Sequence, residues 1–398
     1  MKQTSALRAL LGLTALNFCF LLPPVQAANK TWSGAGSDAN WNTGANWGGT
    51  APVNTDSLVF NGTTQPNNTN NISNLSVTGV NFNNSGFALN GNLFTNTGSA
   101  SSFFTNTAGI NIINNPLFMT APGGRYFFIA AGSELRLAGT VTNNAAAGTS
   151  VGWLNLTNGG TVRILNSCQS TRGMDLFQGT VIVDGSSAVV DANNDGFRFK
   201  PPTGSTVAVQ ITNNGTIRIG GGGNFRMGHN GTGIGAAGAA GGFNRVDMSS
   251  GLLELYGTSV NVLVGDLVSG STAVFNQNGG LVWGSAGSGN AITLGNSAGA
   301  DGTYNFNGGI LWIGQVRQGN AGAANATFNF NGGTLKPTVN STTFFQGLLS
   351  ANILSGGATI DTTNLNITVG QSFAGNGSLK KIGSGTLVMA GSSVVFCK

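Results

Sequence analysis

The sequence predicts an all-β protein, a parallel β-helix whose coils turn at corners rich in glycine and asparagine. The first observation is a unit of an apolar strand end, Asn, Gly-Gly and a second apolar strand. It occurs three times and ends its glycine pair at Gly280, Gly309 and Gly333. Recurrence at about 20 to 50 residues is typical of solenoids. The second observation is that short apolar segments alternate with period two, and no stretch of the mature chain has helical periodicity.

Composition supports this class. Only 7% of the residues are charged, and 65 of the 398 are glycine, yet 40% are hydrophobic and lie in short alternating strings. Such strings favour stacked β-structure over disorder, which goes with polar tracts. The formal net charge is +5, but the basic residues are scattered and only Lys380 and Lys381 are adjacent. Nucleic-acid binding requires a clustered basic stripe, so we expect no nucleic-acid partner.

Residues 1–27 are predicted to be a signal peptide. Lys2 and Arg8 precede an apolar run from Ala9 to Leu22, and the small residues of Val25-Gln26-Ala27 provide a cleavage site. The run is shorter than the roughly 20 residues that cross a bilayer, so we expect no membrane span in the mature chain. After cleavage only Cys168 and Cys397 remain, which is no disulfide framework.

Residues 28–60 are interpreted as an N-terminal cap. This block contains Trp32, Trp41 and Trp47, half of the six tryptophans of the chain. The first coil of a solenoid exposes an apolar end and unpaired strand edges, and aromatic side chains can shield both. The alternative is a platform on which sugar rings stack.

Residues 61–354 are predicted to form the coils. Glycine precedes strands of the form x-apolar-x-apolar, such as Thr216-Ile-Arg-Ile219 after Gly215, and suits a tight corner. Asparagines beside these glycines are expected to form a ladder along the stack. The corners recur too far apart for the hairpins of an antiparallel sandwich. The stretches Gly220–Gly242, Ser285–Asn290 and Gly319–Asn325 are interpreted as loops extruded from the coils.

Residues 355–398 carry the most specific pattern. Leu365-Asn-Ile-Thr-Val369 is followed by Phe373-Ala-Gly-Asn-Gly-Ser-Leu379 and by Lys381-Ile-Gly-Ser-Gly-Thr-Leu387, and then by a Gly-Ser corner at Gly391. This segment resembles the passenger-associated β-strand repeat of autotransporter proteins, and the Trp-rich opening also resembles the start of secreted proteins that carry it. The resemblance implies a right-handed parallel β-helix displayed at, or released from, the surface of a Gram-negative bacterium. Further strands and a barrel would be expected after Lys398, so a truncated chain and a barrel-less secreted relative are both open.

Residues that could perform chemistry are sparse. The single histidine, His229, has no acid or cysteine within eight residues in the chain. Glycosidases need two facing carboxylates, and the only dense acidic stretch is Asp175 to Asp195, in which Asp184 and Asp191 could stack on adjacent strands. We therefore expect no enzyme activity.

One segment suggests weak Ca²⁺ binding. Asp191, Asn193 and Asp195 place oxygen side chains at the first, third and fifth positions of a calcium loop, and Gly196 follows at the sixth. The twelfth position, normally a bidentate Glu, is Pro202. The alternative is a polar turn, and no other cofactor is expected.

These observations predict a non-catalytic, monomeric β-solenoid, secreted or displayed at the cell surface, with an adhesive, matrix or structural role. The alternative is a β-helix that binds or degrades polysaccharide. Its sugar face would be formed by Trp283 and Trp312, with Trp153, because Trp283 and Trp312 each follow a Gly pair by three residues and should stack. That face exists only if the two indoles point outward. A processed fragment of a longer autotransporter is the third possibility.

Overall fold

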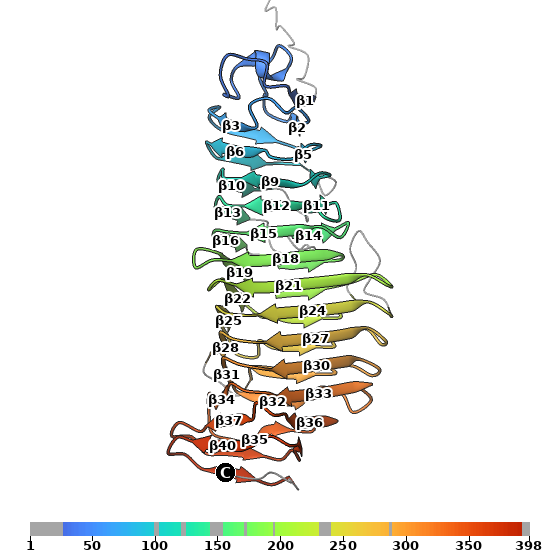
Figure 1. Ribbon diagram of the computed structural model, residues 1–398, viewed down its shortest axis with the longest axis vertical. Helices are drawn as coiled ribbons and strands as arrows, with labels where there is room; N and C mark the ends of the chain where they lie inside the picture. The colour runs from blue at the N-terminus through green and yellow to red at the C-terminus, as the bar shows by residue number, and fades with distance from the viewer. Residues whose placement is uncertain are drawn as a thin grey trace, which may run out of the picture.

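The computed structural model describes residues 27–98, 103–120, 125–143, 154–170, 173–193, 196–230, 240–285 and 289–391. Three long sheets run along a rod, with 15 strands in sheet A and 13 each in sheets B and C (Figure 1). Apart from the first two strands of sheet A, which are consecutive, neighbouring strands of a sheet are three apart in chain order, so the chain visits the three sheets in turn and then repeats. This is the predicted parallel β-helix. Most of the predicted signal peptide lies outside the described residues.

From the second strand onward, the described strands enter sheets A, B and C in turn. Sheet A contains β1 Asn29–Trp32, β2 Ser57–Phe60, β5 Gly79–Phe82, β8 Phe103–Asn106, β11 Arg125–Ile129, β14 Leu154–Thr157, β17 Met174–Leu176, β20 Gly196–Phe199, β23 Asn224–Met227, β26 Val262–Val264, β29 Ala291–Leu294, β32 Gln315–Gln318, β35 Ser341–Gln346, β38 Ile367–Val369 and β41 Leu387–Met389. Sheet B contains β3 Asn67–Asn70, β6 Ala88–Gly91, β9 Ile110–Ile113, β12 Glu134–Leu137, β15 Thr161–Ile164, β18 Gly179–Asp184, β21 Thr206–Thr212, β24 Phe243–Met248, β27 Thr272–Gln277, β30 Asp301–Phe306, β33 Asn325–Phe330, β36 Ser350–Ile353 and β39 Ala374–Gly375. Sheet C contains β4 Leu75–Val77, β7 Phe94–Asn96, β10 Leu117–Met119, β13 Val141–Asn143, β16 Cys168–Ser170, β19 Val189–Asn193, β22 Thr216–Gly220, β25 Leu252–Leu255, β28 Leu281–Gly284, β31 Ile310–Ile313, β34 Thr334–Pro337, β37 Ala358–Asp361 and β40 Leu379–Ile382. A 3₁₀ turn, η1, spans Gly44–Trp47.

The core follows from the alternation within each strand. In β22 the side chains of Ile217 and Ile219 are fully buried, and Arg218 between them points outward. In-register pairing then places equivalent side chains above one another. Phe275, Tyr304 and Phe328 form such an inward stack, with ring centroids 4.8 and 5.2 Å apart and nearly parallel planes. The interior is therefore a continuous apolar core along the rod, into which some asparagine side chains such as Asn68 and Asn106 are also buried.

The glycine corners have the predicted geometry. Gly280, Gly309 and Gly333 have φ angles of 73°, 78° and 75°, in the left-handed region that favours glycine. A Cβ added at Gly309 would collide with the carbonyl oxygen of Gly280. Beside these glycines, Asn307 Nδ2 donates to Asn278 Oδ1 at 2.8 Å and Asn331 Nδ2 to Asn307 Oδ1 at 3.3 Å. The predicted asparagine ladder is confirmed at these corners.

The three N-terminal tryptophans are buried at the end of the rod. Trp32, Trp41 and Trp47 pack edge to face, with Trp47 5.0 Å from Trp32 and 5.8 Å from Trp41 between ring centroids. Each indole N–H donates to a protein oxygen. Rings buried in this way have no free face on which a sugar could stack. The block is also part of the stack itself, because β1 and β2 pair in parallel as the first strands of sheet A.

One predicted loop contains a strand. The expectation of a single extruded loop over Gly220–Gly242 is wrong, because Gly220 ends β22, and Asn224–Met227 forms β23 between β20 and β26. Phe225 and Met227 are fully buried in the core. The flanking glycines concealed this strand in the sequence. Part of the remaining stretch, residues 231–239, lies outside the described residues.

Candidate functional site

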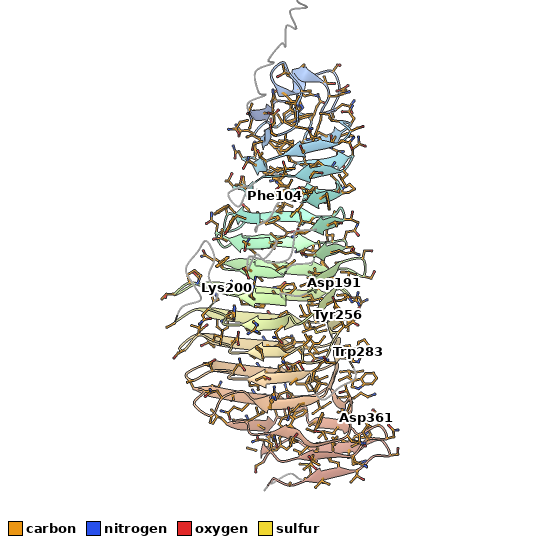
Figure 2. All side chains as sticks on the ribbon, turned by 180° about the vertical axis from the view of Figure 1, so that it is seen from behind. Phe104, Asp191, Lys200, Tyr256, Trp283 and Asp361 are labelled. Atoms are coloured by element: carbon orange, nitrogen blue, oxygen red, sulfur yellow. The ribbon has the colours of Figure 1, made fainter. Side chains whose placement is uncertain are left out.

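A column of charged and aromatic side chains runs along the outside of sheet C, and we call it the sheet C ladder. It occupies one outward position on seven consecutive strands, β19, β22, β25, β28, β31, β34 and β37. From Asp191 to Lys336, each member is paired in strand register with the member on the next strand. The last member, Asp361, is joined to Lys336 by an ion pair. Its members are Asp191, Arg218, Glu254, Trp283, Trp312, Lys336 and Asp361. Figure 2 shows Asp191, Trp283 and Asp361 along one edge of the rod, with Tyr256 beside them.

Arg218 holds together the first part of the ladder. Its Nε lies 2.6 Å from Glu254 Oε2, and its Nη1 lies 3.4 Å from Asp191 Oδ2. The guanidinium also lies 4.9 Å from the ring centroid of Tyr256, whose hydroxyl donates to Asp191 Oδ1 at 2.7 Å. The hydrogen bond to Glu254 raises the pKa of Arg218. Burial, followed by the bond to Asp191, raises the pKa of Tyr256.

The second part of the ladder is centred on two tryptophans. The rings of Trp283 and Trp312 lie 6.3 Å apart between centroids and are tilted by 43°. Trp312 is 37% exposed, so the pair points outward. Trp312 therefore lies between Trp283 of the preceding coil and Lys336 of the next, whose Nζ is 5.2 Å from its ring centroid. Its Nε1 donates to the carbonyl oxygen of Pro337 at 3.0 Å.

Asp361 ends the ladder as a paired carboxylate. It accepts from the backbone N–H of Thr363 at 2.9 Å and lies 3.2 Å from Lys336 Nζ. The Thr363 bond is the larger cause, and Lys336 the smaller, of a pKa below the ordinary value for this carboxyl. Asp361 is therefore held ionised and is unsuited to donating a proton near neutral pH.

The predicted site residues lie as follows. Trp283 and Trp312 face outward and pack against each other, as the sugar-face hypothesis required, whereas Trp153 lies outside the described residues. Asp191 and Asn193 lie within strand β19 rather than in a turn, and Asp195 lies outside the described residues. Both carboxylate oxygens of Asp191 already have protein partners. Within the described ranges, no group of three His, Cys, Asp or Glu residues could hold a metal ion, and Ca²⁺ binding stays a prediction.

Five residues of this site were not singled out from the sequence: Arg218, Glu254, Tyr256, Lys336 and Asp361. A signal for some of them was present. Arg218, Glu254, Trp283, Trp312 and Lys336 each occupy the third position of a strand of four or five residues. Reading that position across coils would have aligned them, because equivalent positions of an in-register parallel stack lie side by side.

The suggested pair of Asp184 and Asp191 does not stack. Asp184 is on β18 of sheet B and Asp191 on β19 of sheet C, because consecutive strands of this fold enter different sheets. Asp184 instead lies 2.6 Å from Arg163 Nη1. Burial opposes ionisation of Asp184, but hydrogen bonds from Asn213 and Arg163 outweigh it and lower the pKa of this carboxyl.

His229 has an acidic partner that is remote in the chain. Its Nδ1 lies 2.9 Å from Oδ2 of Asp266, 37 positions away. Asp266 is fully buried and also binds Arg226 at 3.1 Å and Asn296 at 2.8 Å. The carboxylate is therefore enclosed by its own partners, and the cluster ties neighbouring coils together.

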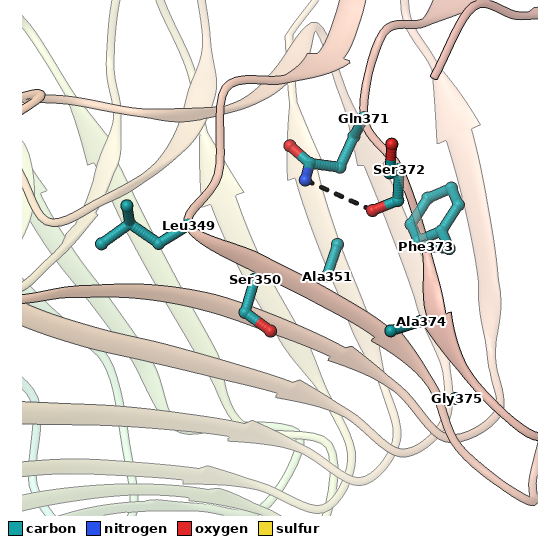
Figure 3. A pocket seen from close by; sticks show the side chains of 8 residues that line it. All are labelled: Leu349, Ser350, Ala351, Gln371, Ser372, Phe373, Ala374 and Gly375. Atoms are coloured by element: carbon teal, nitrogen blue, oxygen red, sulfur yellow. Dashed lines mark hydrogen bonds between the residues drawn. The ribbon is translucent and has the colours of Figure 1, made fainter. Parts of the chain in front are cut away.

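A hollow of about 520 Å³ lies near the C-terminal end (Figure 3). It is lined by Leu349, Ser350, Ala351, Gln371, Ser372, Phe373, Ala374 and Gly375, and Gln371 Nε2 donates to the carbonyl oxygen of Ser372 at 3.3 Å. None of the lining side chains is ionisable. The hollow therefore offers no group for acid–base chemistry.

Comparisons of the chain with protein-family models, with curated proteins and with solved structures each found no match. In the part of the chain that the structure describes, no helix has the length and apolar character needed to cross a membrane.

Proposed function

We propose that this protein is a non-catalytic β-solenoid with an adhesive, matrix or surface-structural role, and that the sheet C ladder is its contact surface. The observation that carries the proposal is the mutual pairing of the ladder's charges. Asp191 and Glu254 are bound by Arg218, and Asp361 by Lys336. Carboxylates whose oxygens are bound by a guanidinium or ammonium group serve as fixed polar contacts.

Location and assembly belong to the same proposal. The apolar run before Ala27 supports export by a signal peptide, and the likeness of residues 355–398 to the autotransporter repeat supports display at, or release from, a Gram-negative surface. We propose a monomer that works without a cofactor. Extracellular or cell-surface polysaccharide is the partner that this location favours.

Adhesion and catalysis are separated by one pair of assays on the mature chain. Beads coated with the protein are expected to adhere to surfaces bearing extracellular polysaccharide, and soluble polysaccharides incubated with it are expected to keep their chain length. Release of new reducing ends by wild type, lost in Glu254→Gln, would contradict the proposal. Failure of the beads to adhere to any such surface would also contradict it.

The second candidate is carbohydrate binding by the tryptophan pair, favoured by the outward position of Trp283 and Trp312. A sugar needs an open ring face, and the face of Trp312 toward the next coil is near Lys336. Lys336→Ala is therefore expected to strengthen binding to a soluble polysaccharide in affinity electrophoresis, and Trp312→Ala to abolish it. Unchanged mobility in both variants would exclude this candidate.

A further inference from the structure

The outward surface of sheet B carries a second ladder, composed of amides. Asn276, Asn305, Asn329 and Asn352 stand on β27, β30, β33 and β36, directly above one another in strand register. Each Nδ2 donates to the Oδ1 of the preceding asparagine, with all three distances at 2.8 Å. Asp247 on β24 accepts from Asn276 at 2.9 Å and begins the series. Figure 1 shows β24, β27, β30 and β33 stacked along the rod.

Two further polar rows flank this ladder. Two positions earlier on β30, β33 and β36 stand Thr303, Thr327 and Ser350, paired in register, and β27 has Val274 at this position. Two positions later is the corner row of Asn278, Asn307 and Asn331, which are joined by their own amide hydrogen bonds. We call these three rows the amide face. The side chains of the three rows are uncharged. The ion pair of Arg245 and Asp247 on β24 lies at one end of the rows, and Asp301 lies two positions before Thr303 at their edge. The rows repeat with the strand spacing of about 4.8 Å.

The amides keep hydrogen-bonding capacity. An Asn side chain has two N–H donors and a carbonyl oxygen with two lone pairs. In the ladder, Asn305 and Asn329 each use one N–H and one lone pair, which leaves one donor and one acceptor for a ligand. Because neighbours already fix these side chains, binding would cost little additional conformational entropy.

The chemistry of the face selects its ligand. A flat surface buries too little of a small molecule, so the ligand must be extended and make many weak contacts at once. The three rows contain no charge to attract nucleic acid or an acidic polymer and no aromatic anchor of the kind that protein partners use. Sugar hydroxyls both donate and accept, as the amides do, and recur along a linear chain.

We propose that the amide face binds an extended, uncharged polysaccharide laid along the solenoid axis. The proposal rests on the adhesive function and adds to it a second surface and a class of ligand. It places the contacts to this neutral polymer on sheet B, separate from the contact surface proposed on sheet C.

The test uses the mature chain and two matched variants. Thr327→Lys introduces a long cation into the amide face on β33, whereas Thr180→Lys makes the same change on β18, five strands away in sheet B. Both threonines are half-buried and outward-facing, which makes the pair comparable. Equal melting temperatures would establish that both variants fold.

Binding is measured by sedimentation with three insoluble neutral polymers, cellulose, mannan and xylan. Calcium-gelled polygalacturonate is the acidic polymer for comparison. We expect wild type and Thr180→Lys to bind at least one neutral polymer equally, with little dependence on salt. Thr327→Lys is expected to bind it about tenfold more weakly, the equivalent of one strong contact. Equal binding by Thr327→Lys and wild type would overturn the inference.

Three other outcomes would also contradict the inference. Binding to polygalacturonate alone, or to none of the neutral polymers, would overturn the inference. Loss of neutral-polymer binding in Trp312→Ala but not in Thr327→Lys would overturn it as well and assign the contact to sheet C. Adhesion of wild type in the bead assay separates this failure from failure of the adhesive function itself.

Discussion

The sheet C ladder and the asparagine ladder of sheet B provide partners for their stacked side chains in different ways. In-register parallel strands place each side chain beside its equivalent in the next coil. An amide can pair with an identical amide because it both donates and accepts, and so Asn276, Asn305 and Asn329 repeat without change. A carboxylate cannot pair with itself, and so the charges of the sheet C ladder alternate in sign from Asp191 through Arg218 to Glu254. The comparison indicates that coils can repeat amides without another kind of partner, whereas stacked charges need an opposite charge nearby. Arg136 and Arg163, for example, are neighbours in register, and Glu134 binds both.

Acid should distinguish the two ladders most strongly. The pKa of Asp361 is lowered in the folded chain, so its contribution is present above the unfolded value of about 4 and is lost as pH falls through the lower, folded value. The amides do not titrate in this range. Asp361→Asn is expected to reduce the fall in melting temperature between about pH 5 and about pH 2. Asn305→Ala is expected to leave that fall unchanged. The reverse pattern would contradict the proposed difference.

Arg218→Ala should be the most damaging single change in either ladder. It leaves Asp191 and Glu254 without their cation, and we expect a loss of about 2 kcal/mol in the free energy of unfolding, measured in denaturant. Arg245→Ala is the control, because Arg245 is 51% exposed and pairs with Asp247 alone. Its expected cost is below about 0.5 kcal/mol. Equal costs for the two variants would show that the ladder is not an energetic unit.

Asn305→Ala should have a smaller effect. It removes two neutral side-chain hydrogen bonds at half-buried positions that water can partly replace, for a loss of about 1 kcal/mol. Asn278→Ala is the comparison, because Asn278 is exposed and its side chain accepts one amide hydrogen bond, from Asn307. Chemical denaturation of both variants measures the difference. A cost for Asn278→Ala equal to that for Asn305→Ala would contradict it.

The interaction between the two tryptophans should have the smallest energy of these effects. Trp283→Ala, Trp312→Ala and the double variant form a cycle whose coupling energy is expected to be about 0.5 kcal/mol, since the rings are offset and partly exposed. A coupling indistinguishable from zero would mean that the two rings are neighbours by register alone. In that case the aromatic part of the sheet C ladder would contribute no stacking energy.

Periodicity in the sequence was enough to predict the architecture. Period-two strands and recurring Gly corners predicted the parallel stack, and the equal spacing of Trp283 and Trp312 from their Gly pairs predicted that they would stack. These features are local, because alternation decides which side chains enter the core and left-handed corners favour glycine. The same local rules failed at β23, where Gly-rich flanks concealed a buried strand.

The partners of each charge were decided only in the folded chain. Arg218 is 27 positions from Asp191 and 36 from Glu254, and Tyr256 is 65 positions from Asp191. Because coils differ in length, sequence distance does not reveal which residues share a column until the strands are in register. The sequence therefore showed where the corners and strands lie, whereas the sheet C ladder, the amide face and the enclosure of His229 with Asp266 are products of how unequal coils align in the stack.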